Sequence, residues 1–584
     1  MSYPNIKDSE FNDKITQKFI KYKIPKRKKT FEQICFPKEF ELQLPQQLLS
    51  HVINPKTPYK GILVYHRIGS GKTCTAINIA EQWKGIRKII IVVPASLIGN
   101  FRGELRSKCA GNTYITDRER NKLNSLHPSD DEYKEIIQKS DDRIDKYYHI
   151  YSYNKFVELL KYNEISLRNS ILIIDEVQNM VSEDGTYYNV LYDAIHEAPV
   201  DLRIILLSAT PMFDKPVEIA LTMNLLRIPF ELPTGREFEK MFIKVAKNKN
   251  TGQYSYKAKN LDLFKERIKG YVSFFRGANP IAFPETTIKY VKCEMSEFQY
   301  QSYVTVIKNE QQTDKDKEDR ILTIRSFRKG QILNLPNDFY IGARLISNVA
   351  FPNKGINEKG FKSFTGKYLQ LENLQNYSIK FYKIMKKINV CPGPTYVYSN
   401  FLEYGGLKSF AKVLEAQGYK NYVEYGEGRK RYALISGDES ASLKEEIKTV
   451  YNQVSNVRGG KLKVLLLSPS AKEGISLKSV RQAHIIEPYW NMARMEQVIG
   501  RGNRLCSHIS LPEENRTFKV YIYIATHPNE KITIDQHIAK MAIKKDRLIN
   551  DFEMAIKQVA IDCQLNKNSN VYPEFSDEDI KCDN

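Results

Sequence analysis

The sequence predicts an α/β protein made of two domains, in each of which helices flank a parallel sheet. Short strand-like runs alternate with helical stretches in two separate regions of the chain, which is the pattern of parallel sheets rather than of sandwiches or bundles. Runs such as IIIVV at 89–93 and ILIID at 171–175 are almost continuously apolar, as expected for strands that are buried on both faces. The 584 residues are enough for several buried cores.

The expected strands fall into two groups of five. The first group covers 61–65, 88–93, 149–153, 171–175 and 203–208, and the second covers 395–399, 432–436, 463–468, 483–487 and 519–524. The pattern divides the chain into a basic N-terminal extension (1–41), a first domain (42–283), an inserted linker (284–376), a second domain (377–530), a helical C-terminal extension (531–566) and an acidic flexible tail (567–584).

Two of these segments have features of their own. The linker contains a charged run, NEQQTDKDKEDR at 309–320, which is too polar to bury and should be exposed. The C-terminal extension has helical spacing and contains VAIDCQLN at 559–566. The sequence assigns no chemistry to this second segment.

Composition indicates a globular protein with a polyanionic partner. Hydrophobic residues make up 42% and charged residues 27% of the chain, which excludes a fibre or a disordered chain. Lys and Arg number 89 against 68 Asp and Glu, a formal net charge of +21. Nucleic acid is therefore the first partner to consider and an anionic membrane the second. Codon bias in an AT-rich genome would also produce a lysine-rich chain.

Hydropathy and cysteine spacing indicate a soluble protein of a reducing compartment. No apolar run approaches the ~18 to 20 residues of a membrane helix, and the start, MSYPNIKDSEF, lacks the features of a signal peptide. The eight cysteines lie far apart without a CxxC pair, which argues against a disulfide framework and a structural zinc site. We therefore expect a cytoplasmic location and no membrane partner.

The strongest local signal is a glycine-rich loop between an expected strand, ILVY at 62–65, and an expected helix. The loop residues are Gly69, Ser70, Gly71, Lys72 and Thr73. Glycines let backbone N–H groups close around phosphates, and the positive end of the following helix points at them. Lys72 would contact the β and γ phosphates of ATP, and the Thr73 hydroxyl would bind Mg²⁺.

The loop departs from the usual phosphate-loop pattern at one place. His66 stands where GxxxxGK[ST] has its first glycine. Taken alone, the loop therefore also fits a simple glycine-rich turn.

An acidic pair, Asp175 and Glu176, follows the apolar run ILII at 171–174. The carboxyl end of a strand is where α/β proteins bind their ligands. Asp175 could bind Mg²⁺, and Glu176 could polarise the attacking water as general base. An isolated acidic pair also fits a solvated strand end, but the phosphate loop upstream favours catalysis.

A pair of arginines occurs in QVIGRGNR at 497–504. Because Arg501 and Arg504 are three residues apart at the start of an expected helix, they would lie on one helical face. Their forked donors suit a transferring phosphoryl group, and Gln497 would help to position them. Taken alone, the same pattern also occurs in salt-bridged surfaces.

The motifs GSGKT, DEVQ, SATP and QVIGRGNR, in this order, resemble those of a superfamily 2 helicase or translocase over residues 42–565. The resemblance implies two tandem RecA-like domains that bind ATP between them, with the arginine fingers in the second. Three segments resemble most the Swi2/Snf2-related branch, which usually moves along duplex DNA without separating its strands. They are PASLIGNF at 94–101, SATPMFDKPVEIALTMNLL at 208–226 and EPYWNMARMEQVIGR at 487–501.

Four further segments resemble one group within that superfamily: ILVYHRIGSGKT (62–73), YSNFLEYGG (398–406), AKEGISLKSV (471–480) and RLCSH (504–508). The group contains poxvirus nucleoside triphosphatase I, the early transcription factor small subunit, and helicases of other large cytoplasmic DNA viruses and yeast cytoplasmic linear plasmids. It tolerates histidine at the position of His66. The resemblance implies a DNA-dependent ATPase that works with a multisubunit RNA polymerase, in promoter opening or transcript release, in the host cytoplasm or the virion.

The same resemblance implies roles for residues outside the catalytic motifs. Gln47 would contact adenine, although its neighbour Gln46 competes for this role, and Gly474 would lie at the nucleotide. The segments that contact DNA or couple it to ATP would contain Pro94, Asn100, Ser208, Thr210, Ser399, Asn400 and Glu473. Each of these could instead be a turn or cap residue.

Three other functions remain open. One is a helicase that separates DNA or RNA strands. Another is a subunit of a transcription complex with a vestigial motor, which the intact carboxylate and both arginines disfavour. The last is a nuclease-linked restriction motor, for which the remaining segments offer no metal-nuclease cluster.

Overall fold

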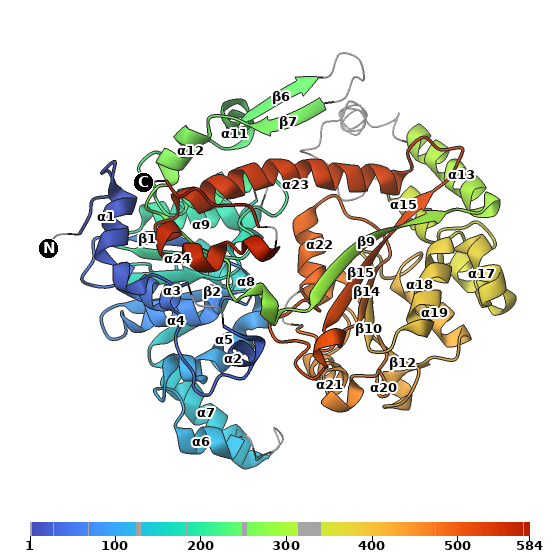
Figure 1. Ribbon diagram of the computed structural model, residues 1–584, viewed down its shortest axis with the longest axis horizontal. Coiled ribbons are helices and arrows are strands. Elements are labelled where there is room, and N and C mark those ends of the chain that lie inside the picture. The colour runs from blue at the N-terminus through green and yellow to red at the C-terminus, as the bar shows by residue number, and fades with distance from the viewer. Residues whose placement is uncertain are drawn as a thin grey trace. The chain divides into compact units, whose positions relative to one another are not determined.

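The structure is a computed structural model that describes residues 3–26, 29–67, 69–123, 125–126, 130–182, 185–247, 254–313, 340–472, 475–575 and 577–583 (Figure 1). The chain divides into two compact units. Unit 1 contains Met1–Val245, Tyr256–Pro280 and Leu548–Asn584, and unit 2 contains Ala246–Ser255 and Ile281–Arg547. Each unit has a parallel sheet with flanking helices, which confirms the predicted fold class.

The sheet of unit 1 has the strand order β3-β2-β4-β5-β1-β8, and all of its neighbouring strands are parallel. Its strands are β1 (Gly61–His66), β2 (Lys88–Val93), β3 (Tyr148–Ser152), β4 (Ser170–Ile174), β5 (Arg203–Ser208) and β8 (Val272–Phe275). Strands β1, β4 and β5 are buried along their whole length. Their continuous apolar runs require helices on both faces of the sheet.

The helices of unit 1 come from its amino-terminal, central and carboxyl-terminal segments. They are α1 (Phe11–Lys18), α2 (Phe31–Cys35), α3 (Leu44–Val52), α4 (Lys72–Glu81), α5 (Ile98–Leu105), α6 (Asp117–Leu123), α7 (Asp131–Asp145), α8 (Tyr153–Lys161), α9 (Thr186–Glu197), α10 (Val217–Asn224), α11 (Gly235–Phe242), α12 (Leu261–Ile268) and α24 (Cys563–Asn570).

The sheet of unit 2 has the strand order β11-β12-β13-β10-β14-β15-β9, again with all neighbours parallel. Its strands are β9 (Glu285–Glu294), β10 (Thr395–Tyr398), β11 (Lys420–Asn421), β12 (Arg431–Ile435), β13 (Val464–Leu467), β14 (Gln482–Ile485) and β15 (Thr517–Thr526). Its helices are α13 (Glu297–Thr313), α15 (Ile341–Asn348), α16 (Glu358–Ser363), α17 (Leu371–Tyr377), α18 (Ile379–Val390), α19 (Leu407–Ala416), α20 (Tyr422–Tyr425), α21 (Ala441–Tyr451) and α22 (Met492–Ile499).

Two further elements contain residues of both units. Helix α23 (Ile534–Val559) does so, and so does the two-stranded sheet of β6 (Ile243–Lys247) and β7 (Tyr254–Ala258). All ten strands expected from the sequence are present, with boundaries that differ by a few residues.

The segment 284–376, which we expected to be a linker, contributes regular structure to unit 2. It contains β9, which pairs along its whole length with β15, and the helices α13, α15, α16 and α17. Strand β9 lies at the edge of the sheet with most of its residues exposed or half-exposed, so its sequence is too polar to resemble the buried strands. In the charged run, 309–313 belong to α13, and 314–320 lie outside the described residues.

The two ends of the chain both pack in unit 1. Phe11 and Ile15 of α1 belong to its hydrophobic core. The tail that we expected to be flexible is instead held by side chains of this unit, because Lys265 forms an ion pair with Asp583 at 2.9 Å and Arg276 forms one with Asp577. The acidic composition of the tail therefore matches basic residues of the same unit.

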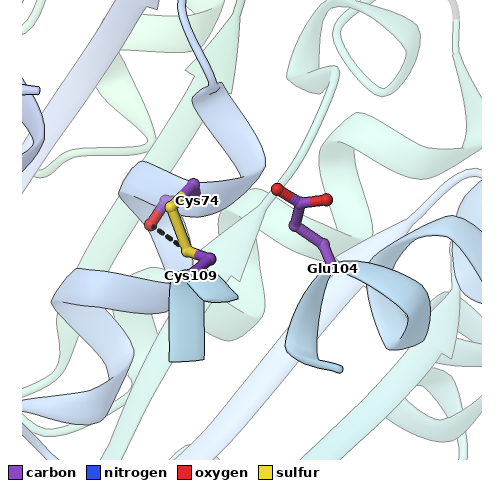
Figure 2. Close-up of side chains that lie close together, drawn as sticks. All are labelled: Cys74, Glu104 and Cys109. Carbon is purple, nitrogen blue, oxygen red and sulfur yellow. Dashed lines mark hydrogen bonds between the residues drawn. A yellow bond between two sulfur atoms is a disulfide. The ribbon is translucent and has the colours of Figure 1, made fainter. Parts of the chain in front are cut away.

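The structure contains disulfides, contrary to our expectation, and two of them lie within unit 1. Cys74 of α4 is bonded to Cys109, and Cys563 is bonded to Cys582. Figure 2 shows the first pair beside Glu104. Because the two sulfur atoms are bonded to each other, Cys74, Cys109 and Glu104 do not form a thiolate metal site in this state. Among the described helices, none has both the length and the apolar character that crossing a membrane requires.

Candidate nucleotide-binding site

The glycine-rich loop of unit 1 connects β1, which ends at His66, to α4, which begins at Lys72. Gly69 and Gly71 have φ angles of 83° and 72°, a left-handed conformation that glycine adopts without steric cost. A Cβ atom on Gly71 would lie 2.5 Å from Nε2 of Gln46. The loop therefore needs glycine at this position, and it presents the amino end of α4 to a ligand.

Lys72 lies next to the predicted general base. Its Nζ donates a hydrogen bond to Oε1 of Glu176 at 2.9 Å, and the side chains are 12% and 25% exposed. Glu176 has a left-handed backbone with φ 50°, which turns the chain sharply after β4. The structure thus brings together the two residues that the sequence predicted to act on the γ phosphate.

The neighbouring carboxylate, Asp175, is buried at the end of β4. Its Oδ1 accepts a hydrogen bond from the backbone N–H of Glu176 at 2.9 Å. The Tyr153 hydroxyl donates to the carbonyl oxygen of Asp175 at 2.6 Å and so fixes the backbone. Asp175 and the Thr73 hydroxyl supply oxygen ligands of the kind that Mg²⁺ prefers.

Hydrogen bonds link the first three predicted motifs in one series, which we call the Lys72 network (Lys72, Glu176, Gln178, Ser208 and Thr210). Gln178 Nε2 donates to Glu176 Oε2 at 2.6 Å, and the Ser208 hydroxyl donates to Gln178 Oε1 at 2.6 Å. The backbone N–H of Thr210 donates to the Ser208 hydroxyl at 3.0 Å. A displacement of Glu176 can therefore reach Ser208 through the single side chain of Gln178.

Gln178 was not assigned a role from the sequence, although it stands in the DEVQ motif. Its amide donates to an acidic side chain and accepts from a hydroxyl, two roles that an amide combines without charge. Its place in the DEVQ motif was the available signal.

The two glutamines of α3 have different surroundings. Gln46 is buried, and its Nε2 donates to the carbonyl oxygen of Gly71 at 3.1 Å. Gln47 is half-buried, and its Nε2 donates to the carbonyl oxygen of Leu42 at 2.9 Å. Gln46 thus supports the phosphate loop, whereas adenine recognition by Gln47 stays a prediction.

Two residues predicted to contact DNA follow strand β2. Pro94 is buried directly after the strand, and Asn100 is exposed on α5. Of this pair, only Asn100 presents its side chain to solvent.

A half-buried carboxylate follows the SATP motif. Glu218 lies on the first turn of α10 and accepts hydrogen bonds from the backbone N–H groups of Phe213 and Asp214. Burial raises the pKa of Glu218 to about 7, against the lowering effect of these hydrogen bonds.

In unit 2 the arginine pair differs from the prediction. Helix α22 ends at Ile499, and Arg501 and Arg504 lie in the turns that follow it, so they do not share a helical face. Gly500 and Gly502 account for the difference, because glycine disfavours continuation of a helix. Arg501 is 9% exposed, and its Nη1 donates to the carbonyl oxygen of Ile475 at 3.3 Å.

Both guanidinium groups lie near the hydroxyl of Tyr396. Burial raises the pKa of Tyr396, and the charges of Arg501 and Arg504 oppose this rise. Gln497, the third predicted member, is half-buried on α22. The structure therefore gathers the two arginines within unit 2.

Ser399 and Asn400 follow β10 and are held by a buried carboxylate. The Ser399 hydroxyl donates to Glu487 Oε2 at 2.9 Å, and Asn400 Nδ2 donates to Glu487 Oε1 at 3.1 Å. Burial raises the pKa of Glu487. Glu473 and Gly474, the other predicted residues of this unit, lie outside the described part of the chain.

Several known proteins are similar to this chain. The family described as "SNF2-related domain" matches residues 44–337. An Acanthamoeba polyphaga mimivirus protein named "Putative ATP-dependent RNA helicase R563" is 51% identical over 583 residues, covering 100% of this chain and 99% of that protein. A "Termination factor NPH-I homolog" of African swine fever virus is 28% identical over 570 residues, covering 87% of this chain and 77% of that protein. Among solved structures, the Pyrococcus furiosus Hef helicase domain aligns with 82% of this chain and 94% of that chain, with 14% identity and a TM-score of 0.41.

Proposed function

We propose that this chain, which belongs to the SNF2-related family and is an ATP-hydrolysing enzyme of the helicase or translocase type, is stimulated by DNA and moves along it during transcription. The main support for ATP turnover at the glycine-rich loop is the Lys72 network. It joins the residues expected to bind phosphate, to activate water and to couple DNA to ATP.

The geometry suggests a sequence of events at this site. Lys72 and the loop N–H groups would bind the β and γ phosphates, and Thr73 with Asp175 would hold Mg²⁺. Because the γ phosphate would then compete with Glu176 for the Lys72 ammonium, Glu176 would be released to accept a proton from the attacking water. Gln178, bonded to Glu176, would report the change to Ser208.

Arg501 and Arg504 would stabilise the charge that spreads over the transferring phosphoryl group. Their planar forked donors suit this role, and their charge is held beside Tyr396. Gln497 would help to position them. Removal of such a group costs about 10³ to 10⁵ in rate in related chemistry.

DNA is the proposed track, with a multisubunit RNA polymerase as the proposed partner. The formal charge of +21 favours a polyanion. The relative from African swine fever virus is named a termination factor homologue, which supports a role in transcript release. Its viral origin supports a cytoplasmic location for the present chain.

The test is the ATP turnover rate with and without nucleic acid. At about 50 mM salt, where electrostatic binding is strong, saturating duplex DNA should raise kcat, at least as well as single-stranded DNA. The Lys72→Ala variant should abolish turnover under every condition. Rates that do not respond to DNA would refute the DNA-dependent part of the proposal, and turnover by Lys72→Ala would refute the assignment of the site.

Strand separation is the second candidate function. The mimivirus relative bears the name of an RNA helicase, which favours testing RNA as well as DNA substrates. Displacement of a triplex strand without unwinding of a duplex would support translocation. Unwinding of either duplex would support a helicase.

A further inference from the structure

The C-terminal segment VAIDCQLN, for which the sequence offered no chemistry, covers the open edge of the sheet in unit 1. Strand β8 is the edge strand. The backbone N–H of Phe274 donates to Asp562 Oδ1 at 2.9 Å, and the N–H of Ile561 donates to the carbonyl oxygen of Val272 at 2.9 Å. Asn566 Nδ2 donates to the carbonyl oxygen of Phe274 at 3.1 Å. Two side chains and one backbone N–H thus satisfy backbone groups that a further strand would otherwise pair.

One of these contacts continues into the phosphate loop. The Ser273 hydroxyl donates to Asp562 Oδ2 at 2.5 Å, and the Oγ atom of Ser273 lies 2.9 Å from Nε2 of His66. All three side chains are fully buried. His66 is the last residue of β1 and occupies the first position of the phosphate loop. Residue 562 is therefore two hydrogen bonds away from the loop that binds the nucleotide.

The direction of these hydrogen bonds fixes the state of the histidine. An ionised carboxylate only accepts, so Ser273 must donate to Asp562. The Ser273 oxygen is then free to accept from His66, which must carry its proton on Nε2 and have an acceptor at Nδ1. Burial, reinforced by the charge of Lys72, lowers the pKa of His66 to about 3. His66 is consequently neutral at pH 7 and adds no positive charge beside Lys72.

The Nδ1 atom of His66 is a buried acceptor. Among the described residues it has no hydrogen-bond partner, and an unpaired buried polar atom is costly. The ring would therefore relax toward another orientation if its Nε2 were not held. At the position of His66 most phosphate loops have glycine, which has no side chain. A rotated imidazole would therefore occupy space that the loop backbone needs.

A second contact joins the same C-terminal region to the loop. Arg67, the residue after His66, forms an ion pair with Glu553 at 3.3 Å, and Glu553 is also paired with Lys557 at 3.1 Å. Both residues that begin the phosphate loop are thus held by the carboxyl-terminal part of the chain.

We propose that Asp562 is a positioning residue for ATP binding, which acts through Ser273 to hold the neutral His66 ring clear of the phosphate loop. This inference rests on the proposed use of the Lys72 loop for ATP. It assigns to VAIDCQLN a task at a nucleotide site formed almost five hundred residues earlier in the chain.

The test compares the Kd of a fluorescent ATP analogue and the KM for ATP in matched variants of the full chain. Asp562→Asn and Ser273→Ala should each raise both constants about five- to tenfold, with a smaller change in kcat. Asn570→Ala is the control. Asn570 accepts from the Arg276 N–H at 2.9 Å and donates to the Phe274 carbonyl at 3.2 Å, so its loss weakens the same edge without touching His66. The control should lower the melting temperature but change both constants less than twofold.

A double-mutant cycle separates positioning from general stability. In a His66→Gly background no ring remains to be held, so Asp562→Asn should no longer change the Kd. If the effect of Asp562→Asn persists in that background, or equals that of Asn570→Ala, the inference is wrong. Ser273→Thr keeps the hydroxyl, so its Kd should be close to that of wild type and not raised as in Ser273→Ala. Loss of turnover in Lys72→Ala with an unchanged Kd in Asp562→Asn would contradict this inference alone and leave the proposed function intact.

Discussion

Replacement of Glu176 by Gln should have two opposite effects, slower ATP hydrolysis and tighter ATP binding, and so tests the catalytic assignment twice. In the structure, Glu176 accepts from Lys72 at 2.9 Å through one oxygen and from Gln178 at 2.6 Å through the other. The amide of Glu176→Gln has a single acceptor, so it can serve only one of these two donors. The variant loses the general base and also weakens the hold on Lys72 before ATP arrives.

The two effects have different sizes and signs. Loss of a positioned base should reduce the hydrolysis rate about 10²- to 10⁴-fold. The Lys72 and Glu176 side chains are partly exposed, at 12% and 25%, so their ion pair is worth about 1 kcal/mol. Because ATP must displace this pair to reach Lys72, its removal should tighten ATP binding roughly fivefold.

The assay is single-turnover hydrolysis together with the Kd of ATP for the same preparation. Glu164→Gln, an exposed carboxylate of the same unit, is the control and should change neither quantity. Hydrolysis within tenfold of the wild-type rate would refute the role of Glu176 as base. Weaker rather than tighter ATP binding would refute the competition between the γ phosphate and Glu176.

Three other predictions follow from the remaining geometry. Arg501→Ala and Arg504→Ala should each lower kcat by about 10³ or more with a small change in the KM for ATP, whereas Arg429→Ala, an exposed control, should not; normal kcat in both variants would rule out an arginine finger here. Ser208→Ala breaks the Lys72 network, so it should lower kcat more with DNA than without, and equal losses would contradict a coupling role. Burial raises the pKa of Glu218 to about 7, so its contribution to stability is present below pH ~4.5 and is lost as the pH rises through 7. The melting temperature of Glu218→Gln should therefore rise relative to that of wild type between about pH 5 and pH 8. A difference in melting temperature that does not change with pH would contradict the raised pKa.

The central strands of both sheets could be predicted from the sequence because a strand that is buried on two faces has a continuous run of apolar residues. Runs such as Ile89–Val93 are fully buried in the structure. Two edge strands were not predicted. Most residues of β9 are exposed or half-exposed, so it has no continuous apolar run, and β8 has only four residues.

The proximity of the phosphate loop and the acidic pair was predictable because each motif follows the end of a parallel strand. The position of the arginines was not predictable in the same way. The prediction assumed that Arg501 and Arg504 lie on one helix, although two glycines stand beside them. Ending α22 at Ile499 places both residues in turns, where local backbone geometry rather than helical period sets the direction of the side chains.

Long-range contacts were beyond the reach of sequence patterns. Gln178 and Ser208 are 30 residues apart, and Ser273 and Asp562 are 289 apart. Neither pair has a spacing rule, because each depends on which strands become neighbours. The Cys74–Cys109 disulfide escaped prediction for the same reason, as the two cysteines are 35 residues apart and lack a motif.

The proposed two-unit chemistry is tested most directly by the structure of the protein bound to ADP, Mg²⁺ and aluminium fluoride, a mimic of the transferring phosphoryl group. We predict that the mimic will contact Lys72 and that a guanidinium of Arg501 or Arg504 will donate a hydrogen bond to its fluoride atoms. If the mimic is bound at Lys72 and every protein contact to the fluoride atoms comes from residues of unit 1, the account is contradicted.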